Sequence, residues 1–146
     1  GESIDETLPI KCQQIDRAIA GLITDLKQRG LFDETLIIWG GEFGRTPMMQ
    51  NNVNSTLKKG RYGRDHHPHA FTMWMAGGGI KPGSYGVTDD IGYYIAENPV
   101  GIRDLQATIL HQIGLNPHRF NFPYQGLNQR LIGPTEEGKV IKQIIS

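Results

Sequence analysis

The sequence is poor in three features that would define its class at once: cysteine, an excess of one charge, and long apolar runs. Cys12 is the only cysteine among 146 residues, which excludes an internal disulfide framework and a cysteine-rich zinc site. Lysine plus arginine and aspartate plus glutamate each number 15, so the formal net charge is zero. Binding to nucleic acid through a basic surplus is therefore excluded. No apolar run approaches the ~20 residues of a membrane-spanning helix, so we expect neither nucleic acid nor a membrane as a partner.

What the sequence does contain is enough apolar residues for a folded core and many residues that form turns. Hydrophobic residues make up 38% of the chain, together with 19 glycines and 8 prolines. We expect residues 1–146 to form a single domain or a domain fragment, because no repeat, linker or low-complexity tract divides them. The chain begins at Gly1 and shows no secretory signal, which suggests a processed piece or a piece of a longer protein.

Two segments carry the periodicity of amphipathic helices. The first starts near Pro9, a residue suited to a first helical turn, and ends at Gly30 as a left-handed cap. Its apolar residues recur three or four positions apart and predict one buried stripe: Ile15, Ala18, Ile19, Leu22, Ile23 and Leu26. The second helix is predicted over residues 103–112, with Gly114 as its stop.

Two apolar runs have the composition of β-strands. Residues 35–39 form an unbroken run after the first helix, which predicts a buried strand of a parallel sheet. Residues 70–76 predict a second strand, which three consecutive glycines end. The order helix, strand, strand, helix predicts part of an α/β layered fold, and so few strands indicate an incomplete sheet. Elsewhere we expect a long mobile loop over 48–63, turns or a small hairpin over 80–99, and irregular chain over 115–134.

The densest group of potential metal ligands lies just before the second predicted strand. Asp65, His66, His67 and His69 place one carboxylate and three imidazoles within five residues, and both groups bind Zn, Mn or Fe. On a strand, His67 and His69 would share one face, whereas in a loop neighbouring residues can converge. The spacing alone leaves two interpretations open: a metal site mounted on a core strand, or a solvated loop that is rich in histidine.

A second candidate site follows the first predicted strand. Glu42 and Arg45 are flanked by Gly41 and Gly44 at the carboxyl end of that strand, where α/β sheets bind their ligands. A carboxylate in this place can bind a metal or act as a base, and the guanidinium of Arg45 can hold phosphate or sulfate oxygens. In the alternative interpretation, the two side chains pair with each other on the surface.

Several strings of the sequence resemble the DUF1501 family. The most specific are residues 42–47 (EFGRTP) and 63–66 (GRDH), and residues 15–22, 76–79 and 104–111 resemble the same family in the same order. The resemblance covers nearly the whole chain. Family members are longer, so the resemblance implies that this chain is their C-terminal part. Many members carry an export signal, which implies a periplasmic or exported location.

The DUF1501 family is similar in turn to the alkaline phosphatase and sulfatase superfamily, whose enzymes hydrolyse phosphate or sulfate esters with one or two metal ions. This likeness implies the C-terminal part of an α/β/α layered sheet, and Arg45 as the catalytic residue that holds a non-bridging oxygen. It also implies a set of ligands for a divalent metal (Zn, Mn, Fe or Ca): Glu42, Asp65, His66 and His67. Phe43 stands where the superfamily has a metal-binding histidine, so one ligand is lost. The superfamily's nucleophile lies in an N-terminal half that this chain does not include.

Three functions follow as hypotheses. The first is the C-terminal portion of a metal-dependent phosphate- or sulfate-ester hydrolase, which acts on a small anionic ester and is inactive as the isolated chain. The second is a non-catalytic relative that binds sulfated or phosphorylated glycans at the cell surface. The third is a structural module whose histidine cluster is incidental. An incomplete sheet leaves apolar strands uncovered, so we also expect either a homo-oligomer or a compact, reduced version of the fold.

Overall fold

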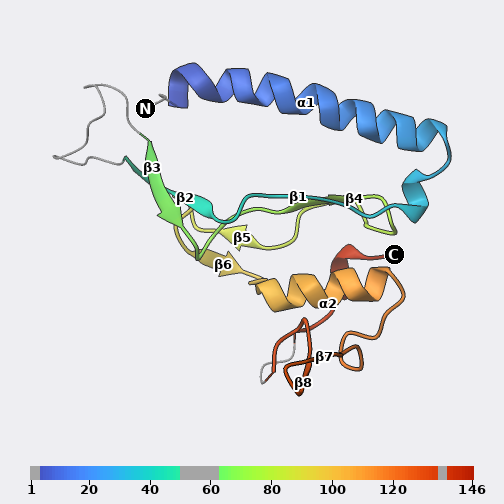
Figure 1. Ribbon diagram of the computed structural model, residues 1–146. Helices are drawn as coiled ribbons and strands as arrows, with labels where there is room; N and C mark the ends of the chain where they lie inside the picture. The colour runs from blue at the N-terminus through green and yellow to red at the C-terminus, as the bar shows by residue number, and fades with distance from the viewer. Residues whose placement is uncertain (1–3, 50–62, 135–137) are drawn as a thin grey trace.

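A computed structural model describes residues 4–49, 63–134 and 138–146 (Figure 1). The described chain is a mixed α and β structure in which helices accompany small two-stranded sheets. In chain order the elements are α1 (Ile4–Gln28), η1 (Phe32–Glu34), β1 (Ile37–Trp39), β2 (Gly44–Met49), β3 (Arg64–His67), β4 (Trp74–Ala76), β5 (Val87–Thr88), β6 (Ile95–Glu97), α2 (Ile102–Gln112), β7 (Phe122–Tyr124), β8 (Leu127–Gln129) and η2 (Lys142–Ile144).

α1 is longer and more exposed than the sequence predicts. It begins five residues before Pro9, so this proline lies inside the helix. Its end agrees with the prediction: Gly30 has a φ of 70°, its N–H donates to the carbonyl of Lys27, and the N–H of Leu31 donates to the carbonyl of Leu26. The prediction of a buried stripe is wrong, since no residue of α1 is buried. The helix runs along the outside of the molecule (Figure 1), and on its apolar side Ile19, Ile23 and Leu26 are only partly buried.

All strand pairs within the described residues are antiparallel. β1 pairs with β4, with Ile37 opposite Ala76 and Trp39 opposite Trp74. The prediction of a buried strand in a parallel sheet is therefore wrong, and Trp39 and Trp74 are 49% and 39% exposed. An unbroken apolar run is shared by strands buried on both faces and by strands of a two-stranded ribbon, so the sequence pattern could not separate the two.

The three glycines that follow β4 are required by the backbone. Gly77, Gly78 and Gly79 all lie in the left-handed region, with φ values of 67°, 50° and 79°. A Cβ on Gly77 would also meet the carbonyl oxygens of Phe32 and Thr35. This agrees with the prediction that three consecutive glycines end the second strand.

The core of the described chain lies around α2. Ala107 and Leu110 pack with Ile132, and the exposed fraction of each of these residues is 5% or less. Partly buried Phe120 and Val140 complete this cluster. α2 confirms the predicted helix over residues 103–112 to within one residue, and no helix among the described residues is long and apolar enough to cross a membrane.

Hydrogen bonds join α2 to the C-terminal segment. The Asp104 carboxylate accepts the N–H of Gly101 at 2.9 Å, which caps the helix, and that of Lys139 at 2.7 Å. The hydroxyl of Thr108 donates to the carbonyl of Asp104 at 2.8 Å and accepts the N–H of Ile141 at 3.0 Å. The bond from Ile141 to Thr108 satisfies a backbone N–H that the packing of the core takes away from water.

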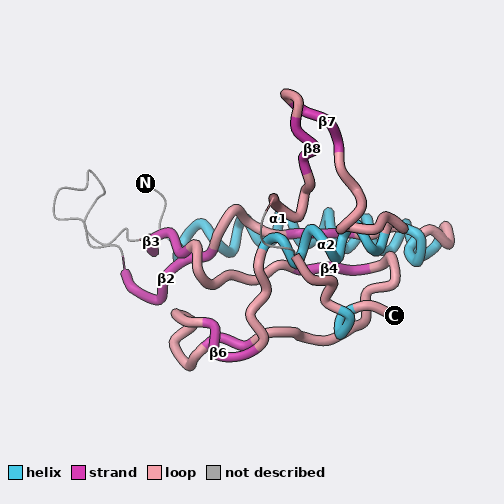
Figure 2. The backbone as a smooth tube through the Cα atoms, turned by 90° about the horizontal axis from the view of Figure 1, so that it is seen from below, coloured by secondary structure: helices cyan, strands magenta, loops and turns pink. Residues whose placement is uncertain are grey.

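Two hairpins occupy the segments on either side of α2. β5 and β6 confirm the small hairpin predicted within residues 80–99. β7 and β8 form a hairpin within residues 115–134, where the prediction of irregular chain is wrong. Its turn holds Gln125 and Gly126 at φ values of 48° and 76°, the signs that a type I′ turn requires. Figure 2 shows this hairpin extending away from the rest of the described chain. Most of the loop predicted over 48–63 lies outside the described residues.

Candidate functional site

The two candidate sites of the sequence meet on one hairpin. β2 carries Arg45 and β3 carries the string from Asp65 to His67, and the two strands pair with Arg45 opposite His66 and Gly44 opposite His67. A Cβ on Gly44 would meet the carbonyl oxygen of Ala70, so this close pairing depends on glycine. The strand register therefore makes neighbours of residues that the sequence analysis treated as separate sites.

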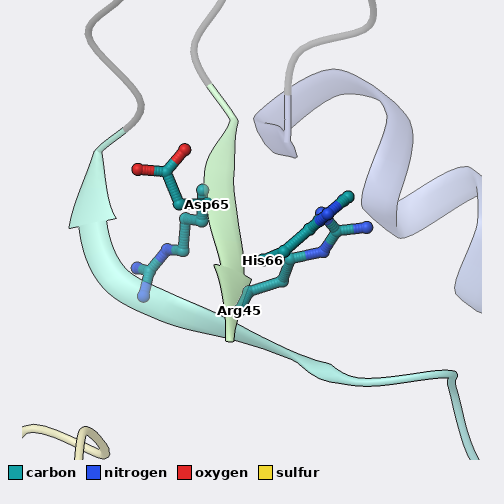
Figure 3. Close-up of a pocket in the computed structure, with 4 residues that line it drawn as sticks. Arg45, Asp65 and His66 are labelled. Atoms are coloured by element: carbon teal, nitrogen blue, oxygen red, sulfur yellow. The ribbon is translucent and has the colours of Figure 1, made fainter. Parts of the chain in front are cut away.

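Arg45 and His66 lie side by side on one side of the hairpin (Figure 3). Residues directly opposite each other on antiparallel strands point to the same face, with their Cβ atoms about 5 Å apart. The ring of Phe43 packs on the ring of His66, with a centroid distance of 4.5 Å and an interplanar angle of 51°. Arg45 and His66 are both exposed. This face therefore offers solvent a fixed cation, an imidazole and an aromatic ring.

Glu42 forms a loose ion pair with Arg45. Its Oε1 lies 4.0 Å from Nη2 of Arg45, and the side chains are 67% and 52% exposed. An exposed pair of this kind contributes about 0–1 kcal/mol to stability. The contact agrees with the alternative interpretation in which the two residues pair on the surface. Because the pair is long and exposed, the guanidinium can still bind an anion from solvent.

The pleat of β3 separates residues that are adjacent in the sequence. Figure 3 shows the Asp65 carboxylate on the opposite side of β3 from the His66 ring, as alternation along a strand requires. Arg45, Arg64, Asp65 and His66 together line an open hollow of about 230 Å³. Two guanidinium groups and one carboxylate give this lining a positive charge, which suits an anionic ligand.

His67 is the buried member of the histidine string, at 3% exposure. Its Nε2 lies 2.6 Å from the carbonyl oxygen of Tyr93, so this nitrogen carries the proton and donates it. The ring stacks on that of Tyr93 at 4.7 Å and meets the edge of the His69 ring at 6.0 Å. His67 thus fastens β3 to the loop before β6, and its Nδ1 is the nitrogen left for a metal.

The predicted metal ligands do not gather as one set. Asp65 and His67 share one face of β3, His66 lies on the other face, and Glu42 lies beside Arg45. Within the described ranges, no three side chains of histidine, cysteine, aspartate or glutamate are grouped so that they could hold a metal ion. These residues on their own do not fit a complete metal centre.

The loop that holds His67 lies within the hairpin predicted over residues 80–99, but its contact with His67 was not predicted. Asp89 accepts the backbone N–H of Tyr93 at 2.7 Å and that of Tyr94 at 3.1 Å. The hydrogen bond from the N–H of Tyr93 is the main reason that the pKa of Asp89 lies below its ordinary value, and desolvation acts in the opposite direction. The sequence signal for this turn was Asp89 with Gly92 three residues later. Gly92 adopts a φ of 71° in the structure.

Comparison with known proteins identifies the family of the chain. The family described as "Protein of unknown function (DUF1501)" matches residues 2–145, which is almost the full length. No curated protein and no solved structure gives a significant match. The match agrees with the strings that carry the resemblance, and two of these, EFGRTP and GRDH, contribute residues to the β2–β3 hairpin. The chain therefore belongs to the DUF1501 family.

Proposed function

We propose that the β2–β3 hairpin binds the anionic group of a phosphate or sulfate ester, as part of a metal-dependent ester hydrolase. The observation that carries this proposal is the position of Arg45 directly opposite His66, with both side chains exposed. A guanidinium offers two parallel N–H donors to an oxyanion, and an imidazole offers one more. Arg64 lines the same hollow and adds positive charge.

The chemistry of ester hydrolysis gives Arg45 a defined role. Negative charge lies on the non-bridging oxygens as a phosphoryl or sulfuryl group is transferred, and a fixed guanidinium stabilises that charge. The likeness of residues 35–44, 71–83 and 103–114 to segments of alkaline phosphatases and sulfatases supports this class of ester and an α/β/α layered sheet in the whole enzyme. No step is assigned to the metal, because the described residues do not complete its site.

The first test measures anion binding by the 146-residue chain. Inorganic phosphate and sulfate are titrated separately by isothermal calorimetry into the native chain and into Arg45→Ala. We expect Arg45→Ala to weaken binding at least tenfold, since it removes a charge-assisted pair of hydrogen bonds. Arg17→Ala is the matched control, because Arg17 is an exposed arginine of α1, distant along the chain from the hairpin. Absence of binding, or an equal loss in both variants, would overturn the proposal.

The second test measures metal content and hydrolysis. Mass spectrometry of the untagged chain is compared with that of the Asp65→Ala/His66→Ala double variant. Metal that is near-stoichiometric in the native chain and absent from the variant would support ligands on β3. A longer family protein that includes these residues should hydrolyse p-nitrophenyl phosphate or sulfate and lose this activity on Arg45→Ala. No hydrolysis across a broad panel of esters, with metal supplied, would count against an enzyme.

The contact of Phe43 with His66 favours a second candidate function, a non-catalytic site for sulfated or phosphorylated glycans. Phe43 packs on His66, which lies opposite Arg45, so the ring could bind the apolar face of a sugar whose anionic group the guanidinium of Arg45 binds. This function predicts that Phe43→Ala weakens binding on an array of sulfated and phosphorylated glycans. It also predicts that the binding needs no metal. An array without any bound glycan would exclude it.

A further inference from the structure

The exposed side of α1 carries a pattern that the proposed function does not use. Six apolar residues follow one another at intervals of four, three, four, three and four positions: Leu8, Cys12, Ile15, Ile19, Leu22 and Leu26. These are the intervals between successive d and a positions of a coiled-coil heptad. Leu8, Ile15 and Leu22 take the d positions and are 54%, 41% and 50% exposed. The d positions of this seam are therefore exposed, whereas Ile19 and Leu26 at a positions are partly buried.

We propose that α1 pairs in parallel with α1 of a second copy of this chain. Charge complementarity selects this arrangement. Lys11 precedes an a position and Asp16 follows a d position, so in a parallel pair each Lys11 faces Asp16 of the partner subunit. An antiparallel pair in register would instead bring Asp16 against Asp16 of the partner subunit. The net charge of zero leaves no overall repulsion between two copies.

The amount of exposed surface agrees with a missing partner. The chain exposes 11034 Å², whereas a compact monomer of 16.3 kDa exposes about 7,500 Å².

The test combines light scattering with cross-linking. We expect the native chain to elute as a dimer in size-exclusion chromatography with light scattering. Leu22→Lys should weaken the dimer by about a hundredfold or more, because it places two charges in the seam. Thr24→Lys is the control, since Thr24 lies on the outer face of the same helix at an f position. Mild oxidation should link the dimer through Cys12, which meets Cys12 of the partner subunit in a parallel pair only.

Each outcome decides for or against the proposal. A dimer that Leu22→Lys dissociates, that Thr24→Lys leaves intact and that oxidation links through Cys12 supports it, with Cys12→Ser as the control for the link. A monomer at tens of micromolar overturns it. A dimer that Leu22→Lys leaves intact, or one that forms no Cys12 link, overturns it as well. Because cross-linking uses the native chain, this result stands even if Leu22→Lys fails to fold, which circular dichroism would reveal.

Discussion

α1 and α2 are both amphipathic helices that end at a glycine in the left-handed region, yet only α2 is packed. Ala107 of α2 is fully buried and contributes to the core, whereas none of the residues of α1 is buried. The difference lies in what surrounds each helix. Phe120, Ile132, Val140 and Ile141 contact α2 from the C-terminal part of the chain, and no segment of the described chain buries a residue of α1. The periodicity of apolar residues thus identifies the face of a helix that is suited to packing, but it does not show which segment packs against that face.

The same hydrogen bond occurs in both helices and allows a direct comparison. Thr24 in α1 and Thr108 in α2 each donate a hydroxyl to the carbonyl four residues earlier, at 2.8 Å. Thr24 is exposed, whereas Thr108 is fully buried and also accepts the N–H of Ile141. Identical local geometry therefore serves different purposes, since only the buried hydroxyl satisfies a second group that water cannot reach.

The largest expected contrast comes from apolar truncation. Ile132→Ala should lower the free energy of unfolding by about 3 kcal/mol, because it leaves a cavity against Ala107 and Leu110. Ile10→Ala on the outer face of α1, where Ile10 is 55% exposed, should change it by less than about 0.5 kcal/mol. Urea titration followed by circular dichroism measures both. Equal losses of unfolding free energy in the two variants would contradict the difference in packing between α1 and α2.

A smaller contrast is expected for the two threonines. Thr108→Val should cost about 2 kcal/mol of unfolding free energy, since it leaves the buried N–H of Ile141 without its acceptor. Thr24→Val should stay within about 0.5 kcal/mol of the native chain. Hydrogen exchange of the Ile141 amide provides an independent reading, because its protection should fall in Thr108→Val alone. Unchanged protection would contradict the role assigned to this hydroxyl.

The smallest effect is expected from pH. Backbone N–H donors hold the pKa of Asp89 below its ordinary value, so the carboxylate stabilises the folded loop at pH values above about 4. This stabilisation is lost as the pH falls through the lowered folded-state pKa. The amide resonance of Tyr93 should follow that titration by NMR, and Asp89→Asn should abolish it. Asp25→Asn, which removes an exposed carboxylate paired with Arg29 on α1, should leave it unchanged. A Tyr93 resonance that titrates at the ordinary aspartate pKa would contradict the hydrogen bonds.

The sequence predicts the helices of this fold better than its sheets. The bounds of α2 and the turns at Gly30 and Gly114 follow from local rules of periodicity and backbone conformation. The direction of β1 depends on its pairing with β4, which no local pattern contains. The β7–β8 hairpin carried local signals in Gly126, Phe122 and Tyr124, but Pro123 and Asn128 have low strand propensity and obscure the pattern.

The candidate site could be predicted as a set of residues but not as an arrangement. Arg45 and His66 were both identified from residue type and neighbouring glycines, yet only the strand register places them face to face. The run from Asp65 to His67 suggested one cluster, and the pleat of β3 divides it between two faces. The contact between His67 and Tyr93 joins distant parts of the chain, so no local sequence pattern predicts it.

The pairing of β1 with β4 has a consequence for the order in which the chain folds. Trp39 and Trp74 are partners although 35 residues separate them, whereas the β7–β8 turn joins immediate neighbours. Closing the longer loop costs more chain entropy, so the ribbon assembles after the local hairpins and the helices. The β2–β3 hairpin lies inside the loop that this pairing closes. Because two tryptophans face each other in this ribbon, the intrinsic fluorescence of the chain should follow the formation of the β1–β4 pair.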